Sequence, residues 1–263
     1  MFSRLTRRQY LVTCSQISNL PEITEGKQVK TRSKRLCLLL LAGPFLLASS
    51  ALAGNQDWRI WFDQSVKGKV TEHIDLRAKQ SFRTENDAGT LGTYYIEAAL
   101  VTHLTTWLDL SPAYRQQVTK DKGQWLDENR PYVDATIKWK LLNLAFSDRN
   151  RFEYRFRQAR DDTFRYRNKL SSVFPKKWTP LELQPYVAGE AFFDEGVKAT
   201  DRNRMRFTFG AKTDPETRLR ALGLKPKEGL RMTTDFYFHY QSTDRDGDTV
   251  DEYIAGVNFG VSL

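Results

Sequence analysis

Arginine recurs at every second position in several short stretches of the chain, with aromatic residues between. In residues 151–157, RFEYRFR, the odd positions are charged and the even positions are aromatic. The stretches 204–209 and 231–241 also carry their apolar side chains at alternate positions. Because successive side chains of a β-strand point to opposite faces, each stretch would present polar groups on one side and apolar groups on the other. Rings of arginine around a narrow aqueous passage favour anions.

Acid–base chemistry has few candidates in this sequence. The histidines are His73, His103 and His239, all at positions compatible with the polar face of a strand. A serine–histidine–acid site also needs a nucleophile segment, and the sequence has neither a Ser-Asn-Gly segment nor a G-x-S-x-G segment. We therefore predict no catalytic residues and no enzymatic activity. His239 with Asp235, further back on the same face, is the only pair that a lipid-modifying alternative would use.

Oxygen ligands occur at alternate positions near the end of the chain, at Asp244, Asp246 and Asp248. Calcium takes about six to eight oxygen ligands, commonly from a flexible loop. Gly247, however, comes too early for the glycine of an EF-hand, and Asp-Gly is also an ordinary hairpin signal. The three aspartates are therefore weak metal candidates. We expect a solvated turn here, with no bound metal and no other cofactor.

The elements that must position these side chains are amphipathic strands. Ten runs with a period of two are each about 10 to 15 residues long, which exceeds the usual globular strand and suits a tilted strand that crosses a membrane. They predict an all-β fold, a transmembrane antiparallel up-and-down β-barrel of about ten strands. The runs are 69–83, 92–104, 106–115, 131–141, 144–157, 162–173, 180–192, 201–212, 228–241 and 250–263.

An eleventh run at 58–66 conflicts with the even strand number of bacterial barrels. We expect it to lie at the periplasmic mouth or inside the lumen without spanning, and twelve strands is the competing count. If the last strand ends in the periplasm, the outer links are 84–91, 116–130, 158–161, 193–200 and 242–249. The inner links are then near 105 and at 142–143, 174–179 and 213–227.

The N-terminal part of the chain has the pattern of an export signal. A basic stretch precedes the apolar run 36–53, LCLLLLAGPFLLASSALA, which ends in small residues. We expect residues 1–53 to be an N-terminal extension plus a secretory signal peptide that is removed, and residues 54–263 to form a single barrel domain. Most of the formal charge of +9 and both cysteines, Cys14 and Cys37, fall in the removed part. The mature domain then has no disulfide and no basic excess of the kind that nucleic acid requires.

The polar face of each run is assigned to the lumen, because charged groups on the lipid face are costly. The result is either an anion-preferring conduit or a ladder of cross-strand ion pairs that fills a small barrel and holds it together. The predicted lumen-lining residues are Arg77, Lys79, Asp134, Lys138, Arg151, Glu153, Arg155, Arg157, Arg165, Arg167, Glu190, Arg202, Arg204, Arg206, Asp235, His239 and Glu252.

Several stretches of the chain resemble one family of bacterial outer-membrane barrels, catalogued as domain of unknown function 2490. The resemblance covers most of the mature chain. It implies a barrel without an assigned activity, and it supplies no catalytic residues. The stretches are 58–61 (WRIW), 151–157, 164–167 (FRYR), 185–186 with 190–193 (EAFF), 201–204 (DRNR) and 236–240 (FYFHY).

These patterns together predict a small barrel of the bacterial cell outer membrane, of porin-like or structural type, with an Arg-rich lumen. The alternating last run, 253–263, resembles the signal that outer-membrane assembly machinery recognises, although it ends in leucine and not in the usual phenylalanine. The expected partners are this machinery, outer-membrane lipid and lipopolysaccharide, with no nucleic acid and a monomeric state. The alternatives are a barrel enzyme acting on lipid or lipopolysaccharide, and a soluble periplasmic β-protein that binds an acidic ligand.

Overall fold

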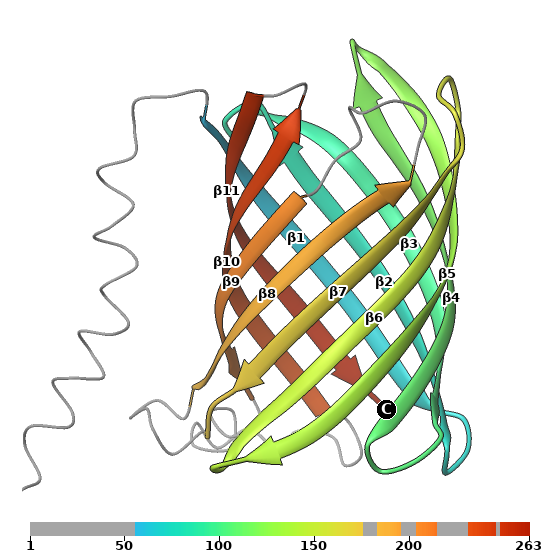
Figure 1. Ribbon diagram of the computed structural model, residues 1–263, viewed down its shortest axis with the longest axis vertical. Helices are drawn as coiled ribbons and strands as arrows, with labels where there is room; N and C mark the ends of the chain where they lie inside the picture. Colours follow the sequence, from blue (N-terminus) through green and yellow to red (C-terminus); the bar gives the residue numbers. More distant parts are fainter. Residues whose placement is uncertain (1–55, 176–182, 196–203, 215–230, 246–247) are drawn as a thin grey trace, which may run out of the picture. The chain divides into compact units, whose positions relative to one another are not determined.

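The computed structural model describes residues 56–175, 183–195, 204–214, 231–245 and 248–263. These residues form eleven strands in one closed barrel. Each strand pairs with its neighbours in the chain, and β1 pairs with β11, so the strand order around the barrel follows the sequence (Figure 1). The all-β barrel prediction is confirmed, but the strand number is eleven and not about ten or twelve.

The strands are long and strongly tilted (Figure 1). Their bounds are β1 Gln56–Lys69, β2 Ile74–Glu85, β3 Thr90–His103, β4 Leu108–Asp121, β5 Gln124–Leu141, β6 Leu144–Arg157, β7 Thr163–Val173, β8 Gln184–Glu195, β9 Arg204–Thr213, β10 Arg231–Arg245 and β11 Asp248–Ser262.

The segment that was expected not to span, 58–66, lies within β1 and closes the barrel. It pairs antiparallel with β2 and parallel with β11, from Gln56 opposite Asp251 to Lys67 opposite Ser262. An odd number of up-and-down strands leaves the first and last strands pointing the same way, so their pairing must be parallel. The prediction failed because it applied the even-number rule to a chain that closes in this other manner.

A second correction concerns the predicted outer link 116–130. All of these residues except Lys122 and Gly123 belong to strands, because β4 and β5 continue as a hairpin that extends to Asp121 and Gln124. The connecting residues Lys122 and Gly123 both have positive φ, 49° and 85°, as in the two-residue turns that match the twist of a hairpin. The hairpin lies at the end of the barrel opposite the C-terminus (Figure 1). The predicted link 242–249 is likewise shorter, since β10 and β11 pair as far as Arg245 and Asp248.

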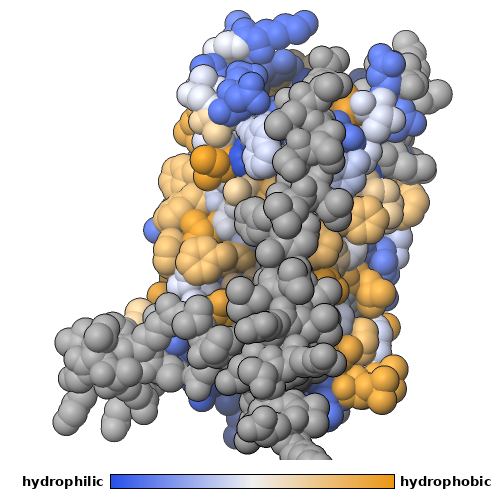
Figure 2. All heavy atoms as spheres, turned by 90° about the vertical axis from the view of Figure 1, so that its left-hand side faces the viewer, coloured by the Kyte–Doolittle hydropathy of each residue, from blue (hydrophilic) through white to orange (hydrophobic). Residues whose placement is uncertain are grey.

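The barrel has a polar interior and an apolar exterior. Its most deeply buried side chains include Glu153 and Glu252, whereas Ile96, Leu100 and Phe207 expose nearly half of their surface. The face shown in Figure 2 carries a band of apolar side chains with polar residues above and below it. There is no second sheet against which this band could pack, since the described strands form one closed barrel.

None of the described residues forms a helix of the length and hydrophobicity needed to cross a membrane. The predicted leader, residues 1–53, lies outside the described residues, as does most of the predicted link 213–227.

Two tyrosines repeat one contact across neighbouring strands. The ring of Tyr237 on β10 lies over Gly256 on β11, and its hydroxyl donates to Asp63 on β1 at 2.9 Å. Tyr186 on β8 likewise lies over Gly210 on β9 and donates to Asp235 on β10 at 3.2 Å. The first of these contacts crosses the junction between β11 and β1, so side chains reinforce the parallel closure.

Gly256→Val should weaken the barrel, because its Cβ would overlap the Tyr237 ring and force that ring away from Asp63. Overpacking of this kind costs about 1–3 kcal/mol. The measurement is the free energy of unfolding in urea of the refolded barrel in detergent. Gly189→Val is the matched control, since Gly189 also lies within a strand and a Cβ there meets no atom within 4 Å. Equal losses in both variants would contradict the assigned contact.

Candidate functional site

The barrel encloses a cavity of about 590 Å³, to which all eleven strands contribute side chains. Sixteen of the described residues that line it are lysine or arginine, and nine are aspartate or glutamate. The alternation of each strand positions these groups, because every second side chain points inward. The lining is therefore polar and carries an excess of positive charge.

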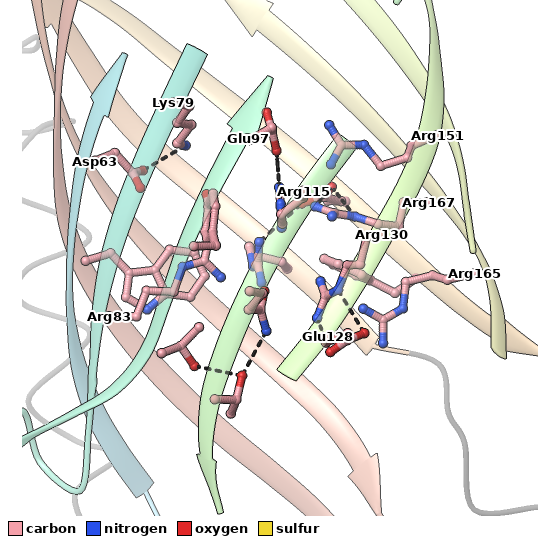
Figure 3. Close-up of a pocket in the computed structure, with 18 of the residues that line it drawn as sticks. Asp63, Lys79, Arg83, Glu97, Arg115, Glu128, Arg130, Arg151, Arg165 and Arg167 are labelled. Atoms are coloured by element: carbon pink, nitrogen blue, oxygen red, sulfur yellow. Dashed lines mark hydrogen bonds and ion pairs between the residues drawn. The ribbon is translucent and has the colours of Figure 1, made fainter. Parts of the chain in front are cut away.

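Paired charges form one wall of the cavity, on β3 to β6. Arg151 binds Asp134 through two nitrogens at 2.7 and 2.8 Å, and both residues are almost fully buried. Arg115 binds Glu97 at 2.6 and 3.0 Å in the same two-nitrogen manner. Figure 3 shows Arg115 directed at Glu97, and Lys79 directed at Asp63 across β1 and β2. Such two-pronged contacts are the strongest geometry available to a guanidinium group.

Two buried carboxylates are each shared among several arginines. Glu190 accepts from Arg149 at 2.6 Å and from Arg167 at 2.7 Å, and Arg206 lies 3.3 Å away. Glu153, which is 1% exposed, lies between the guanidinium groups of Arg165 and Arg167 at 3.4 and 3.6 Å. Each of these two carboxylates thus faces two or more cations, so an excess of positive charge remains around them.

Aromatic rings inside the barrel stack against several of the guanidinium groups, including two that also contact Glu190. The Arg83 Cζ lies 3.7 Å from the centre of the Trp61 ring, and the Arg206 Cζ lies 4.9 Å from the same ring. Phe192 is contacted in the same way by Arg167 at 4.6 Å and by Arg206 at 4.9 Å. Stacking on a ring stabilises a cation without neutralising it.

Three interior cations have no carboxylate oxygen within 4.0 Å among the described residues: Arg83, Lys169 and Arg204 all line the cavity without such a contact. Arg83 donates to the Tyr95 hydroxyl at 3.1 Å, and Arg204 donates to Thr243 at 3.1 Å. Their positive charge therefore faces the cavity without a direct ion-pair partner among the described residues.

A separate ionic chain crosses five strands at the end of the barrel where β3 ends. His103 lies between two carboxylates, with Nδ1 at 2.8 Å from Asp109 and Nε2 at 2.9 Å from Asp75. Lys138 continues the chain from Asp109, and Lys67 continues it from Asp75, each at 2.7 Å. None of these five residues lines the cavity, so the chain fastens the strand ends of β1 to β5.

Most of the predicted lumen residues face the cavity, and the exceptions have identifiable positions. Asp134 and Glu153 are interior ion-pair partners behind the lining, Lys138 belongs to the ionic chain at the strand ends, and Arg202 lies outside the described residues. The predicted residues that line the cavity are Arg77, Lys79, Arg151, Arg155, Arg157, Arg165, Arg167, Glu190, Arg204, Arg206, Asp235, His239 and Glu252.

The candidate catalytic pair is not brought together. His239 Nδ1 lies 2.8 Å from the hydroxyl of Thr208, while Asp235 accepts from Tyr186. His73 was expected on an inner strand face, but it lies exposed in the turn before β2, because that strand begins only at Ile74.

The candidate metal loop is also largely strand. Asp244 and Asp248 belong to β10 and β11, and Asp246 lies outside the described residues. Within the described part of the chain, no three His, Cys, Asp or Glu side chains are grouped so that they could hold a metal ion.

Sequence reasoning missed several lining residues for two reasons. The prediction omits Trp61 and Asp63 because it expects 58–66 not to span, and it omits Glu128 and Arg130 because it places 116–130 in a link between strands. In 58–66 the alternation of polar and apolar residues continues, and this signal would have included the first two residues. Residues 116–130 are mostly polar on both faces, so the sequence gives no such signal for the other two.

Asp134→Ala should destabilise the barrel strongly, because it leaves the Arg151 guanidinium buried without its partner. Breaking a buried pair costs about 3–5 kcal/mol, to be measured as the free energy of unfolding in urea. The control is Asp121→Ala, which removes the exposed pair with Arg160 and should cost no more than about 1 kcal/mol. A loss for Asp134→Ala as small as that of the control would show that the interior pair is not structural.

The chain resembles several solved structures at low sequence identity. It is 13% identical to the anion-selective porin from Comamonas acidovorans (TM-score 0.36), covering 73% of this chain but only 54% of the porin. LpxR from Salmonella typhimurium is 8% identical (TM-score 0.40; 73% and 84% covered), and OccK3 (OpdO) from Pseudomonas aeruginosa is 11% identical (TM-score 0.31; 70% and 65% covered). No curated protein matches. The model of a family described as protein of unknown function (DUF2490) matches residues 58–228, and the chain therefore belongs to the DUF2490 family.

Proposed function

We propose that this protein is an outer-membrane β-barrel whose cationic lumen admits anions from water. The observation that carries the proposal is the sixteen-to-nine excess of basic over acidic residues around a cavity of about 590 Å³ in a closed barrel. In this proposal the segment 1–53 directs export, and outer-membrane lipid surrounds the apolar band.

Placement in a membrane is supported by the distribution of apolar surface. Large apolar side chains such as Ile96, Leu100, Phe152 and Phe207 are about half exposed on the outside of the barrel. A soluble monomer rarely exposes a continuous apolar area of this kind. The described strands have 10 to 18 residues, enough for a tilted strand to cross the hydrocarbon core, which needs about 9–11.

The preference for anions follows from the charges that the walls do not cancel. Ion pairs such as Arg151 with Asp134 stabilise the wall and contribute little net field. Arg83, Lys169 and Arg204 have no such partner among the described residues, and they face the cavity. A passage lined by one sign of charge and bounded by a wall of low dielectric constant concentrates ions of the opposite sign.

The competing structural role, in which ion pairs simply fill the barrel, accounts for only part of the interior. The paired residues explain the rigid wall on β3 to β6, yet they leave a cavity large enough for a solute. Ligand cavities in proteins commonly measure about 300–1,000 Å³. The cross-strand ion pairs and the anion-admitting cavity are therefore two parts of the same barrel interior.

In planar bilayers the protein should conduct and show a reversal potential, under a potassium chloride gradient, that indicates preference for chloride. Arg83→Glu combined with Arg204→Glu should shift that potential toward cation preference. Neither arginine has an ion-pair partner among the described residues, so its reversed charge acts directly on ions in the cavity. Lys122→Glu is the control of equal charge change, since Lys122 lies exposed in the β4–β5 turn. Absence of current, or a reversal potential that the double variant leaves unchanged, would contradict the proposal.

Ile96→Arg tests the membrane placement separately. Ile96 lies at the middle of β3 and points outward. If lipid surrounds it, arginine there should destabilise the membrane-inserted, folded barrel by about 2–4 kcal/mol. Leu142→Arg in the exposed β5–β6 turn is the control and should have little effect. A surface position in water would tolerate Ile96→Arg within about 0.5 kcal/mol, so a negligible effect would argue for a soluble barrel.

A further inference from the structure

Six residues of the cavity lining form what we name the two-ring cluster: the rings of Trp61 and Phe192 and the guanidinium groups of Arg83, Arg167, Arg204 and Arg206. Arg83 and Arg206 contact the Trp61 ring at 3.7 and 4.9 Å. Arg167, Arg206 and Arg204 contact the Phe192 ring at 4.6, 4.9 and 5.6 Å. Arg206 belongs to both sets, so four guanidinium groups gather around two rings. All six residues line the cavity.

The two-ring cluster carries more positive charge than its carboxylates can balance. Two carboxylates lie within 4.0 Å of its arginines in the described part of the chain. Glu153 lies 3.6 Å from Arg167 and is shared with Arg165, and Glu190 contacts Arg167 and Arg206. Glu190 is also bound by Arg149 at 2.6 Å, so even that charge is divided. Arg83 and Arg204 contact only neutral oxygens. A bound anion would relieve the mutual repulsion of these buried cations.

A further hydrogen-bond donor faces the same region. Trp61 is 6% exposed, and its indole Nε1 donates to no described residue. A buried donor without an acceptor costs free energy. An anionic oxygen bound beside the Trp61 ring would satisfy it, which is an indication of a ligand independent of the charge excess.

The positions of the four guanidinium groups favour a ligand with acceptors on several sides. Arg83 comes from β2, Arg167 from β7, and Arg204 and Arg206 from β9, so the guanidinium groups approach from different sides of the lumen. A planar carboxylate offers oxygens in one plane and chloride is a single sphere, whereas a tetrahedral oxyanion offers acceptors in all directions. Guanidinium forks are well matched to phosphate oxygens.

We infer that the two-ring cluster is a binding site for a tetrahedral oxyanion, the phosphate or sulfate group of a small water-soluble solute. This inference rests on the proposed function and adds the class of solute to it. The source is taken as soluble because the sheet is closed, so a lipid headgroup has no opening between strands through which to enter.

The test is calorimetric titration of the full barrel, refolded in detergent, with inorganic phosphate, sulfate, acetate and chloride. Phosphate and sulfate should bind saturably, and acetate and chloride at least about tenfold more weakly. Loss of one charged hydrogen-bonding group corresponds to about 10- to 100-fold in affinity, which is the loss expected for Arg83→Gln and for Arg204→Gln. Arg204→Lys should retain part of the affinity, since it keeps the charge but not the fork. Lys122→Gln is the matched control and should bind as the parent does.

Folding of each variant is checked first by the heat-dependent gel mobility of the barrel, and Arg204→Gln serves alone if Arg83→Gln does not fold. The inference is overturned if the folded parent binds neither phosphate nor sulfate, if acetate binds equally well, or if the arginine variants keep the parent affinity. Chloride currents in bilayers separate the two proposals. Chloride selectivity without phosphate binding would refute the site and leave the conduit, whereas phosphate binding without current would refute the conduit and leave the site.

Discussion

Closure of the backbone hydrogen-bond ladder is the constraint on which the rest of the structure depends. β1 and β11 pair over twelve residues, so neither strand leaves an open edge. A closed cylinder separates two environments completely, and alternation along each strand then sorts the side chains between them. Only within such an enclosure can Arg151, Glu153 and Glu190 be buried together, because each needs several charged or polar partners at once.

The interior combines two uses of arginine that follow from its chemistry. Where a carboxylate stands opposite on the next strand, as Asp134 stands opposite Arg151, the guanidinium group forms a two-pronged bond and becomes part of the wall. Where the opposite residue is a ring or a hydroxyl, as for Arg83 and Arg204, the group keeps its charge and faces the cavity. Arginine therefore has two roles here. Opposite a carboxylate it makes the wall rigid, and opposite a ring or a hydroxyl it contributes positive charge to the cavity.

The period-two pattern was sufficient to predict the barrel, its polar interior and most of the lining, since alternation is a local property of each strand. Residues such as Arg155 and Arg206, which the alternation alone places inside, line the cavity. The strand number was not predictable in the same way, because whether β1 spans depends on a pairing between the two ends of the chain. Pairing partners were equally hidden: nothing local to Glu190 indicates that Arg149, Arg167 and Arg206 converge on it from three strands.

The tyrosine that lies over Gly256 has a consequence for how the cylinder is completed. Tyr237 reaches Asp63 only when β11 and β1 meet in one alignment, with Trp61 opposite Gly256. A slip of one residue would turn every inward side chain of β1 outward. It would also separate the Tyr237 hydroxyl from the Asp63 carboxylate, so both would lose their hydrogen-bond partner. The contact therefore favours one register of the β1–β11 junction, because a misaligned junction would leave these buried polar groups unmatched.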